Sequence, residues 1–279
     1  MLGTRSTFLQ LLLTATSVSA INILFVGNSF THGNIEPTVS YNKGNINDAN
    51  GSGYGGVPGI FKKLADTAGK NYSVTIEAVS AQTLEFHYEN RASIIAQKQW
   101  NVVVLQEYST LPVPAARGGN PTLFAQGVAN VVALVRAHSN ATVYLYETWV
   151  RPDQVYPSGA PYSGQDIRVM QTDLHNSYTT QSSAVSAKGV AYVGDGFVKA
   201  IDSGLADANP YDSTVATVDV WASDNYHASK YGSYLSAVTI FSKVTGVSPT
   251  SLANGAGTAA EGLGITAGIA TKLQASVVV

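Results

Sequence analysis

Two short motifs, far apart in the chain, contain the residue types of a nucleophilic catalyst. Gly27-Asn28-Ser29 lies near the N-terminal end, and Asp224-x-x-His227 lies near the C-terminal end. Asp and His at this spacing can fold so that the carboxylate holds one imidazole nitrogen, which leaves the other free to take a proton from a hydroxyl. We therefore predict a triad with Ser29 as nucleophile, His227 as base and Asp224 as the orienting acid.

The residues before Ser29 predict where it lies. Residues 21–26 form a mostly apolar run, Ile-Asn-Ile-Leu-Phe-Val, that leads into Gly27. Such a run is typical of a buried parallel strand, and functional groups on open parallel sheets gather beyond the carboxyl ends of the strands. Ser29 would stand at such an end. The alternative is that Ser29 only caps a following helix.

Together the two motifs resemble the SGNH (GDSL-type) hydrolases, with a resemblance that spans most of residues 21–246. It implies a flavodoxin-like α/β/α sandwich and an esterase or deacetylase that works through an acyl-enzyme. Asn28 departs from the family, which usually has Asp at this position. Because Asn28 is not the nucleophile, the predicted triad is unaffected.

The resemblance also implies an oxyanion hole. Its donors would be the backbone N–H of Ser29, the backbone N–H of Ala81, and the side chain of Gln106. Ala81 stands where the family has Gly, and Gln106 stands where it usually has Asn. A backbone N–H survives the first change, although Ala tolerates a positive φ less well than Gly. The alternative for Gln106 is a hydrogen-bonded polar residue at the end of a strand.

Helical and strand patterns alternate along the rest of the chain. The expected helices cover 58–70, 84–98, a segment from Pro121 with Asn120 as its N-cap, 163–187 and 228–245; the expected strands cover 72–79, 100–105, 141–146 and 189–193. This alternation predicts an α/β fold in which a parallel sheet is covered on both faces, with right-handed crossovers. Ser29, Ser80, Gln106 and Glu147 would then follow strand ends on one edge.

Several polar and aromatic side chains are candidates for contact with a substrate. Residues 34–56 are rich in Asn, Gly and Tyr and predict a long loop beside Ser29, either a substrate-contacting lid or a passive insertion. A tryptophan at a strand end, such as Trp149, packs in the core as often as it stacks on the ring of a substrate. The candidates are Asn28, His32, Tyr54, Glu107, Trp149 and Tyr226.

Composition and charge limit the kinds of partner and cofactor that we expect this chain to bind. The net charge is −2 and charged residues make up 12% of the chain, which does not suggest a nucleic-acid surface. Cysteine is absent, so thiol catalysis and thiolate metal sites are excluded. No His-x-x-x-His pattern or cluster of carboxylates predicts a metal site, and we expect no cofactor. His87, His138 and His175 have no acidic partner at useful spacing and are expected on surfaces or helix faces.

The N-terminal segment predicts export. Residues 1–20 contain Arg5, an apolar core over 8–13 and small residues up to Ala20, the pattern of a signal peptide cleaved after Ala20. The core is too short to span a bilayer. We expect one secreted monomeric domain over 21–279, whose Gly- and Ala-rich tail (247–279) either docks as a weak helix near 257–272 or stays partly loose. Asn50, Asn71 and Asn140 lie in glycosylation sequons.

These observations favour a secreted serine esterase with a small-molecule or polysaccharide ester as substrate. Low charge, the Tyr- and Asn-rich segment and secretion favour removal of O-acyl groups, above all acetyl, from carbohydrate. A short-chain lipid ester is the nearest rival substrate. A catalytically silent carbohydrate-binding or surface protein on the same scaffold is the alternative from another class.

Overall fold

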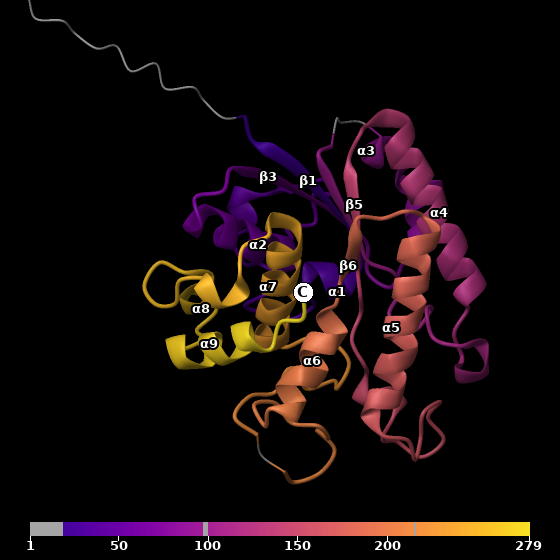
Figure 1. The fold of residues 1–279 in the computed structure, drawn as a ribbon, viewed down its shortest axis with the longest axis vertical. Coiled ribbons are helices and arrows are strands. Elements are labelled where there is room, and N and C mark those ends of the chain that lie inside the picture. Colours follow the sequence, from indigo (N-terminus) through magenta and orange to yellow (C-terminus); the bar gives the residue numbers. More distant parts are fainter. Residues whose placement is uncertain (1–18, 97–99, 215) are drawn as a thin grey trace, which may run out of the picture.

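The computed structural model describes residues 19–96, 100–214 and 216–279, where a parallel sheet lies between two layers of helices (Figure 1). In spatial order its six strands are β2 (Asn47–Asp48), β3 (Tyr72–Ala78), β1 (Ile21–Gly27), β4 (Val102–Leu105), β5 (Thr142–Tyr146) and β6 (Gly189–Ala191). The helices are α1 (Ser29–His32), α2 (Gly56–Thr67), α3 (Leu84–Ile95), α4 (Pro121–His138), α5 (Ile167–Ala184), α6 (Val193–Asp202), α7 (Lys230–Thr245), α8 (Ala259–Gly262) and α9 (Ala267–Ala275). Short 3-10 turns lie at Lys43–Asn45, Ala115–Arg117, Pro152–Gln154 and Pro249–Ser251.

Strand β1 is buried on both faces, as its continuous apolar run predicts. Ile23 and Phe25 belong to the core under α2 and α7, whereas Leu24 and Val26 belong to the core under α3 and α4. All four side chains are fully buried. A strand covered on both faces cannot show polar alternation, which is why this segment appears as an unbroken apolar run in the sequence.

The strand order places a topological switch next to Ser29. The chain leaves β1 for β3 on one side and later returns to β4 on the other side. Gly27 pairs with Ala78, and Val26 pairs with Leu105, so the carboxyl ends of these three strands are level. Open parallel sheets bind ligands at such a point, because the loops diverge there and leave a crevice.

The predicted α/β/α architecture is confirmed, and so are several element ends. Asn120 caps α4 by accepting a hydrogen bond from Leu123 N, and Gly246 ends α7 with φ 72°. Other predictions were wrong in detail. The segment 34–56 is not a loop throughout, because it includes β2, which pairs with β3. Helix α6 was missed, since its glycine-containing start directly follows the short strand β6.

The C-terminal tail contains helices rather than a loose segment. Helices α8 and α9 lie at the ends of the segment that was predicted as one weak helix, and α9 contacts α7. In the described part of the chain, no helix is long and apolar enough to cross a membrane. Residues 1–18 of the predicted signal peptide lie outside the described residues.

Candidate active site

The nucleophile turn joins β1 to the single-turn helix α1. Asn28 is the N-cap, and its Oδ1 accepts a hydrogen bond from Phe30 N at 3.1 Å. Ser29 is the first residue of the helix and is 5% exposed. Gly27 is required before it, because a Cβ there would lie 2.3 Å from Thr31 Oγ1. The cap is therefore Asn28, and the hydroxyl of Ser29 is free for another role.

The Asp224-x-x-His227 motif folds into a turn that holds the imidazole. Asp224 Oδ2 lies 2.6 Å from His227 Nδ1, and Asp224 Oδ1 accepts hydrogen bonds from the backbone N–H groups of Tyr226 and His227. Partial burial raises the pKa of the Asp224 carboxyl, but the hydrogen bonds from His227 and Tyr226 outweigh it and hold this pKa below its usual range. Asp224 is thus a carboxylate that fixes the orientation of the ring.

The two motifs meet at the carboxyl edge of the sheet. His227 Nε2 lies 2.9 Å from Ser29 Oγ, although the residues are 198 positions apart. Two tryptophans anchor the histidine loop to the segment after β5: Trp149 Nε1 donates to Tyr226 O at 3.1 Å, and Trp221 Nε1 donates to Val150 O at 3.0 Å. An acid, an imidazole and a hydroxyl therefore form one hydrogen-bonded chain.

The amide of Gln106 is engaged in holding the nucleophile turn. Its Oε1 accepts from Asn28 N at 3.0 Å and from Thr31 Oγ1 at 2.8 Å. Its Nε2 donates to Glu107 O, and the side chain is buried. These contacts match the alternative in which Gln106 is a hydrogen-bonded polar residue at a strand end. Gln106 is therefore linked to the nucleophile turn through the backbone N–H of Asn28.

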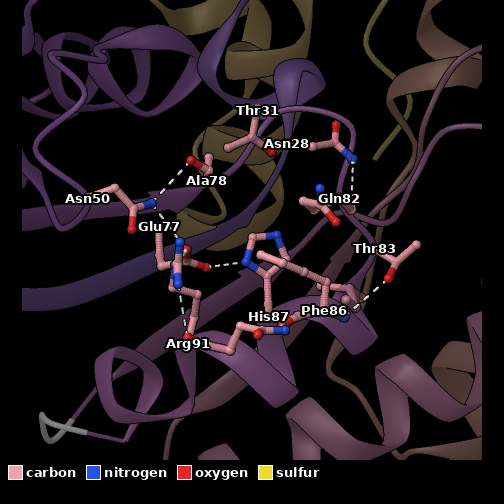
Figure 2. Close-up of polar contacts among 12 residues, drawn as sticks. Asn28, Thr31, Asn50, Glu77, Ala78, Gln82, Thr83, Phe86, His87 and Arg91 are labelled. Atoms are coloured by element: carbon pink, nitrogen blue, oxygen red, sulfur yellow. Dashed lines mark hydrogen bonds and ion pairs between the residues drawn. The ribbon is translucent and has the colours of Figure 1, made fainter.

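Two backbone N–H groups, one of them that of the nucleophile itself, have no hydrogen-bond partner among the described residues. Within the described residues, no hydrogen bond uses the N–H of Ser29 or of Ala81. Ala81 has φ 59°, the left-handed conformation that glycine adopts most readily. Asn28 Nδ2 donates to Gln82 O at 2.9 Å, which ties the loop of Ala81 to the nucleophile turn (Figure 2).

His32 and Tyr54 lie beside this loop and stack on each other. Their ring centroids are 4.0 Å apart, with an interplanar angle of 9°. His32 Nε2 lies 2.8 Å from Ser80 Oγ. Burial lowers the pKa of His32 to about 4, so its imidazole is neutral at pH 7. Tyr54 is only partly buried, so its ring, unlike that of His32, has exposed surface that a ligand can contact.

Glu107 does not line the site. Its side chain is fully buried, and Oε1 accepts hydrogen bonds from Leu84 N at 3.1 Å and Tyr108 N at 2.6 Å. It therefore satisfies the N-terminus of α3, and burial raises its pKa to about 8. The prediction that Glu107 contacts substrate is corrected, because no part of this carboxyl faces solvent.

Trp149 is a core residue rather than a platform for a sugar ring. It is 0% exposed and stacks between Phe30, at 4.0 Å, and Phe197, at 5.0 Å, between ring centroids. The prediction of substrate contact is corrected here too. Asn28, at 2% exposure, is likewise occupied by its bonds to Phe30 and Gln82.

Tyr226 is the predicted substrate contact that stands against the imidazole. Its ring centroid lies 3.8 Å from that of His227, and the Arg151 guanidinium lies 3.8 Å from the Tyr226 ring. Arg151 is fixed by Asp153 Oδ2 at 2.6 Å and by Ser109 Oγ at 3.0 Å. Arg151 was not among the predicted site residues; its position soon after a predicted strand end was the available signal.

Two of the histidines have carboxylate partners, contrary to expectation. His87 Nδ1 lies 2.5 Å from Glu77 Oε2 and both side chains are fully buried, a contact drawn in Figure 2. His175 Nδ1 lies 2.8 Å from Asp195 Oδ2. The expectation failed because each partner is on another element of the fold. His138 is exposed, as expected.

Comparisons with known proteins connect this geometry to a fold. No family model matches the sequence, and no curated protein matches it. Among solved structures, a DUF4886 family protein from Bacteroides uniformis is 15% identical, with a TM-score of 0.64 over 92% of this chain and 93% of that one. A protein proposed to be an SGNH hydrolase, from Slackia heliotrinireducens, is 20% identical, with a TM-score of 0.57 over 81% of this chain and 100% of that one. A psychrotrophic esterase from Pseudoalteromonas sp. is 14% identical, with a TM-score of 0.51 over 81% and 97%.

The fold is therefore the α/β/α fold of SGNH hydrolases. At these identities the comparisons concern the fold and not the activity.

Proposed function

We propose that this chain is a serine ester hydrolase. The observation that carries the proposal is the hydrogen-bonded chain from Asp224 through His227 to Ser29, with distances of 2.6 Å and 2.9 Å. Acyl transfer needs a nucleophile within reach of a base and a base held by a third group. A psychrotrophic esterase from Pseudoalteromonas sp. has a similar fold, so this scaffold is compatible with an esterase site.

In the proposed mechanism, ester hydrolysis proceeds in two steps, acylation of Ser29 and then its deacylation. His227 Nε2 takes the proton of Ser29 as its Oγ attacks the acyl carbon, and Asp224 stabilises the resulting imidazolium. The imidazolium returns that proton to the leaving alcohol as the C–O bond breaks, which leaves an acyl group on Ser29. Water, deprotonated by His227, then attacks the acyl-enzyme, and the acid leaves as the proton passes back to Ser29.

The free N–H groups of Ser29 and Ala81 are our candidates for the oxyanion hole. Ser29 begins α1 and Ala81 lies in the loop after β3, and the bond from Asn28 to Gln82 joins these two segments. Loss of one such donor typically costs about 3–4 kcal/mol of transition-state stabilisation. In this proposal Gln106 acts through Asn28 and Thr31, and direct donation by its side chain stays a prediction.

We propose O-acetylated carbohydrate as the substrate class. Ser29 and His227 are only 5% and 7% exposed, which favours a small acyl group over a long chain. Tyr54 and Tyr226 supply partly exposed aromatic rings near the nucleophile, and rings of this kind stack on sugars. Export through the predicted signal peptide, cleaved after Ala20, would bring the enzyme to such polymers outside the cell.

The test combines labelling with turnover. We expect p-nitrophenyl acetate hydrolysis by the wild type, none above background for Ser29→Ala, and attachment of a fluorophosphonate probe to the peptide that contains Ser29. Acetate release from an acetylated polysaccharide should exceed hydrolysis of a long-chain p-nitrophenyl ester. Folded protein with no turnover and no label would contradict the proposal and favour a silent binding protein; preference for the long chain would favour a lipid ester.

A further inference from the structure

A second group of ionisable side chains lies away from the triad. Glu147, His175 and Asp195 each offer one ligand atom, and these atoms all lie within 4.8 Å of one another. His175 Nδ1 is 2.8 Å from Asp195 Oδ2 and 3.7 Å from Glu147 Oε1. Neither the triad nor the proposed oxyanion hole uses any of them.

Three separate elements bring the group together. Glu147 directly follows β5, His175 lies in α5, and Asp195 lies in the first turn of α6. Figure 1 shows α5 and α6 next to each other at the β6 side of the sheet, and contacts between the two helices agree. The three residues span 49 positions, so no short sequence motif indicates that they form a group.

Glu147 supplies the observation that points to a ligand. Its carboxyl is 0% exposed; Oε2 accepts from Asp195 N at 3.1 Å, whereas Oε1 has no hydrogen-bond partner. Oε1 is also the atom directed toward His175 Nδ1. Within the described residues, no ion pair joins a Lys or Arg to Glu147 or Asp195. A buried carboxylate oxygen without a donor or a cation is costly unless something binds it.

The surroundings shape the group further. Gln171, one turn before His175, accepts from Val150 N at 2.9 Å and donates to Asp195 Oδ1 at 3.3 Å. A Cβ on Gly194 would lie 2.2 Å from the Gln171 amide, so glycine is needed for this close approach. A groove of about 190 Å³ between α5 and α6 reaches His175 and Asp195 from solvent.

We propose that Glu147, His175 and Asp195 bind a divalent transition-metal ion, for which Zn²⁺ is the best fit. One imidazole nitrogen and two carboxylate oxygens are ligands that Zn²⁺ accepts. The ion would supply the positive charge that Glu147 lacks and would link β5, α5 and α6. The His175 and Asp195 side chains are 38% and 22% exposed, and Glu147 is not, so an ion can enter from the groove and reach the buried oxygen.

Binding would replace one hydrogen bond of the group. His175 Nδ1 lies 2.8 Å from Asp195 Oδ2, and an ion at Nδ1 would take the place of that contact. Because metal ligands bind in their deprotonated form, Zn²⁺ affinity should fall at acid pH.

The experiment uses the untagged full chain, treated with a chelator and then titrated with ZnCl₂. We expect calorimetry to show one Zn²⁺ per chain, and we expect a higher Tm. At a hundredfold excess over Kd the rise should be about 5 °C. His175→Gln, a substitution at a partly exposed position, should weaken binding at least tenfold, as should Glu147→Gln.

Matched variants locate the ion. His138→Gln removes an exposed histidine on α4, and His227→Gln removes the triad imidazole; both should bind Zn²⁺ as the wild type does. Absence of Zn²⁺ binding in the wild type would overturn the proposal. So would unchanged binding in His175→Gln, or loss of binding in His227→Gln alone.

Discussion

Glu107 and Glu147 occupy equivalent positions after neighbouring strands. The register of β4 and β5 pairs Leu105 with Leu145, so the two carboxyls leave the sheet at the same level. Each is fully buried, and each accepts a hydrogen bond from the first turn of a helix, Glu107 from Leu84 of α3 and Glu147 from Asp195 of α6. A buried glutamate after each of these two strands thus links the carboxyl edge of the sheet to a helix, one on each face.

Because burial raises the pKa of Glu107 from 4.5 to about 8, stability should depend on pH. Between these values the folded protein keeps a proton that the unfolded chain releases. The free energy of unfolding therefore falls as pH rises, by up to about 1.4 kcal/mol per pH unit from this group. Glu107→Gln should flatten the dependence in urea unfolding between pH 5 and 8.

Glu89→Gln is the matched control for that measurement, since Glu89 is exposed on the same helix α3. It should leave the pH dependence of the wild type intact. An identical slope in Glu107→Gln and the wild type would show that Glu107 is ionised in the folded protein.

Asp224→Asn tests the orienting acid. Asn retains an Oδ1 that accepts from the N–H groups of Tyr226 and His227, so the turn should keep its stability. It loses the carboxylate that fixes the His227 tautomer, and kcat should fall by about 10²–10⁴-fold. Asp219→Asn, in the same loop but bonded to Trp221 N, should retain kcat. Equal kcat in Asp224→Asn and the wild type would remove Asp224 from the triad.

Gln106→Ala tests how the amide serves the site. The change leaves two donors, Asn28 N and Thr31 Oγ1, without their acceptor, and should lower the free energy of unfolding by about 1–3 kcal/mol. Displacement of the nucleophile turn should lower kcat by up to about 10²-fold with KM nearly unchanged.

Thr31→Val separates positioning from direct donation to the oxyanion by Gln106. If Gln106 positions Ser29 through α1, Thr31→Val also lowers kcat, and its effect is not additive with Gln106→Ala. If the side chain donates directly, Thr31→Val keeps full kcat while Gln106→Ala loses about 10²–10³-fold. Steady-state kinetics of the two single variants and the double variant decide between these roles.

Ala81 should accept glycine but not valine. Its φ of 59° strains an L-residue, and a β-branched side chain is strained most there. We expect Ala81→Gly to retain kcat within about twofold, because the backbone N–H stays in place. Ala81→Val should cost about 1–3 kcal/mol of stability and should lower kcat.

Ser186 offers the comparison for Ala81, because it has φ 49° in the turn after α5, far from the triad in the fold. Ser186→Val should reduce stability and leave kcat unchanged. A similar kcat loss in both valine variants would mean that strain alone, rather than the N–H of Ala81, explains the effect.

The sequence by itself determined the fold class and the pairing of Asp224 with His227. The apolar run before Ser29 has no polar alternation, so it specifies a strand buried on both faces, and the strand–helix alternation specifies parallel pairing. Asp224 and His227 are close enough in sequence that a local turn joins them. These features depend on local pattern, which a chain shows before it folds.

Tertiary structure decided which polar groups satisfy one another. Gln106, Trp149 and Glu107 all follow predicted strand ends, where a functional role and a structural role have the same sequence signal. Packing assigned Gln106 to the nucleophile turn, Trp149 to the core and Glu107 to the start of α3. The group of Glu147, His175 and Asp195 likewise exists only once three elements meet. A buried polar atom takes its partner from whichever element lies beside it, and that neighbour is set by the fold rather than by sequence spacing.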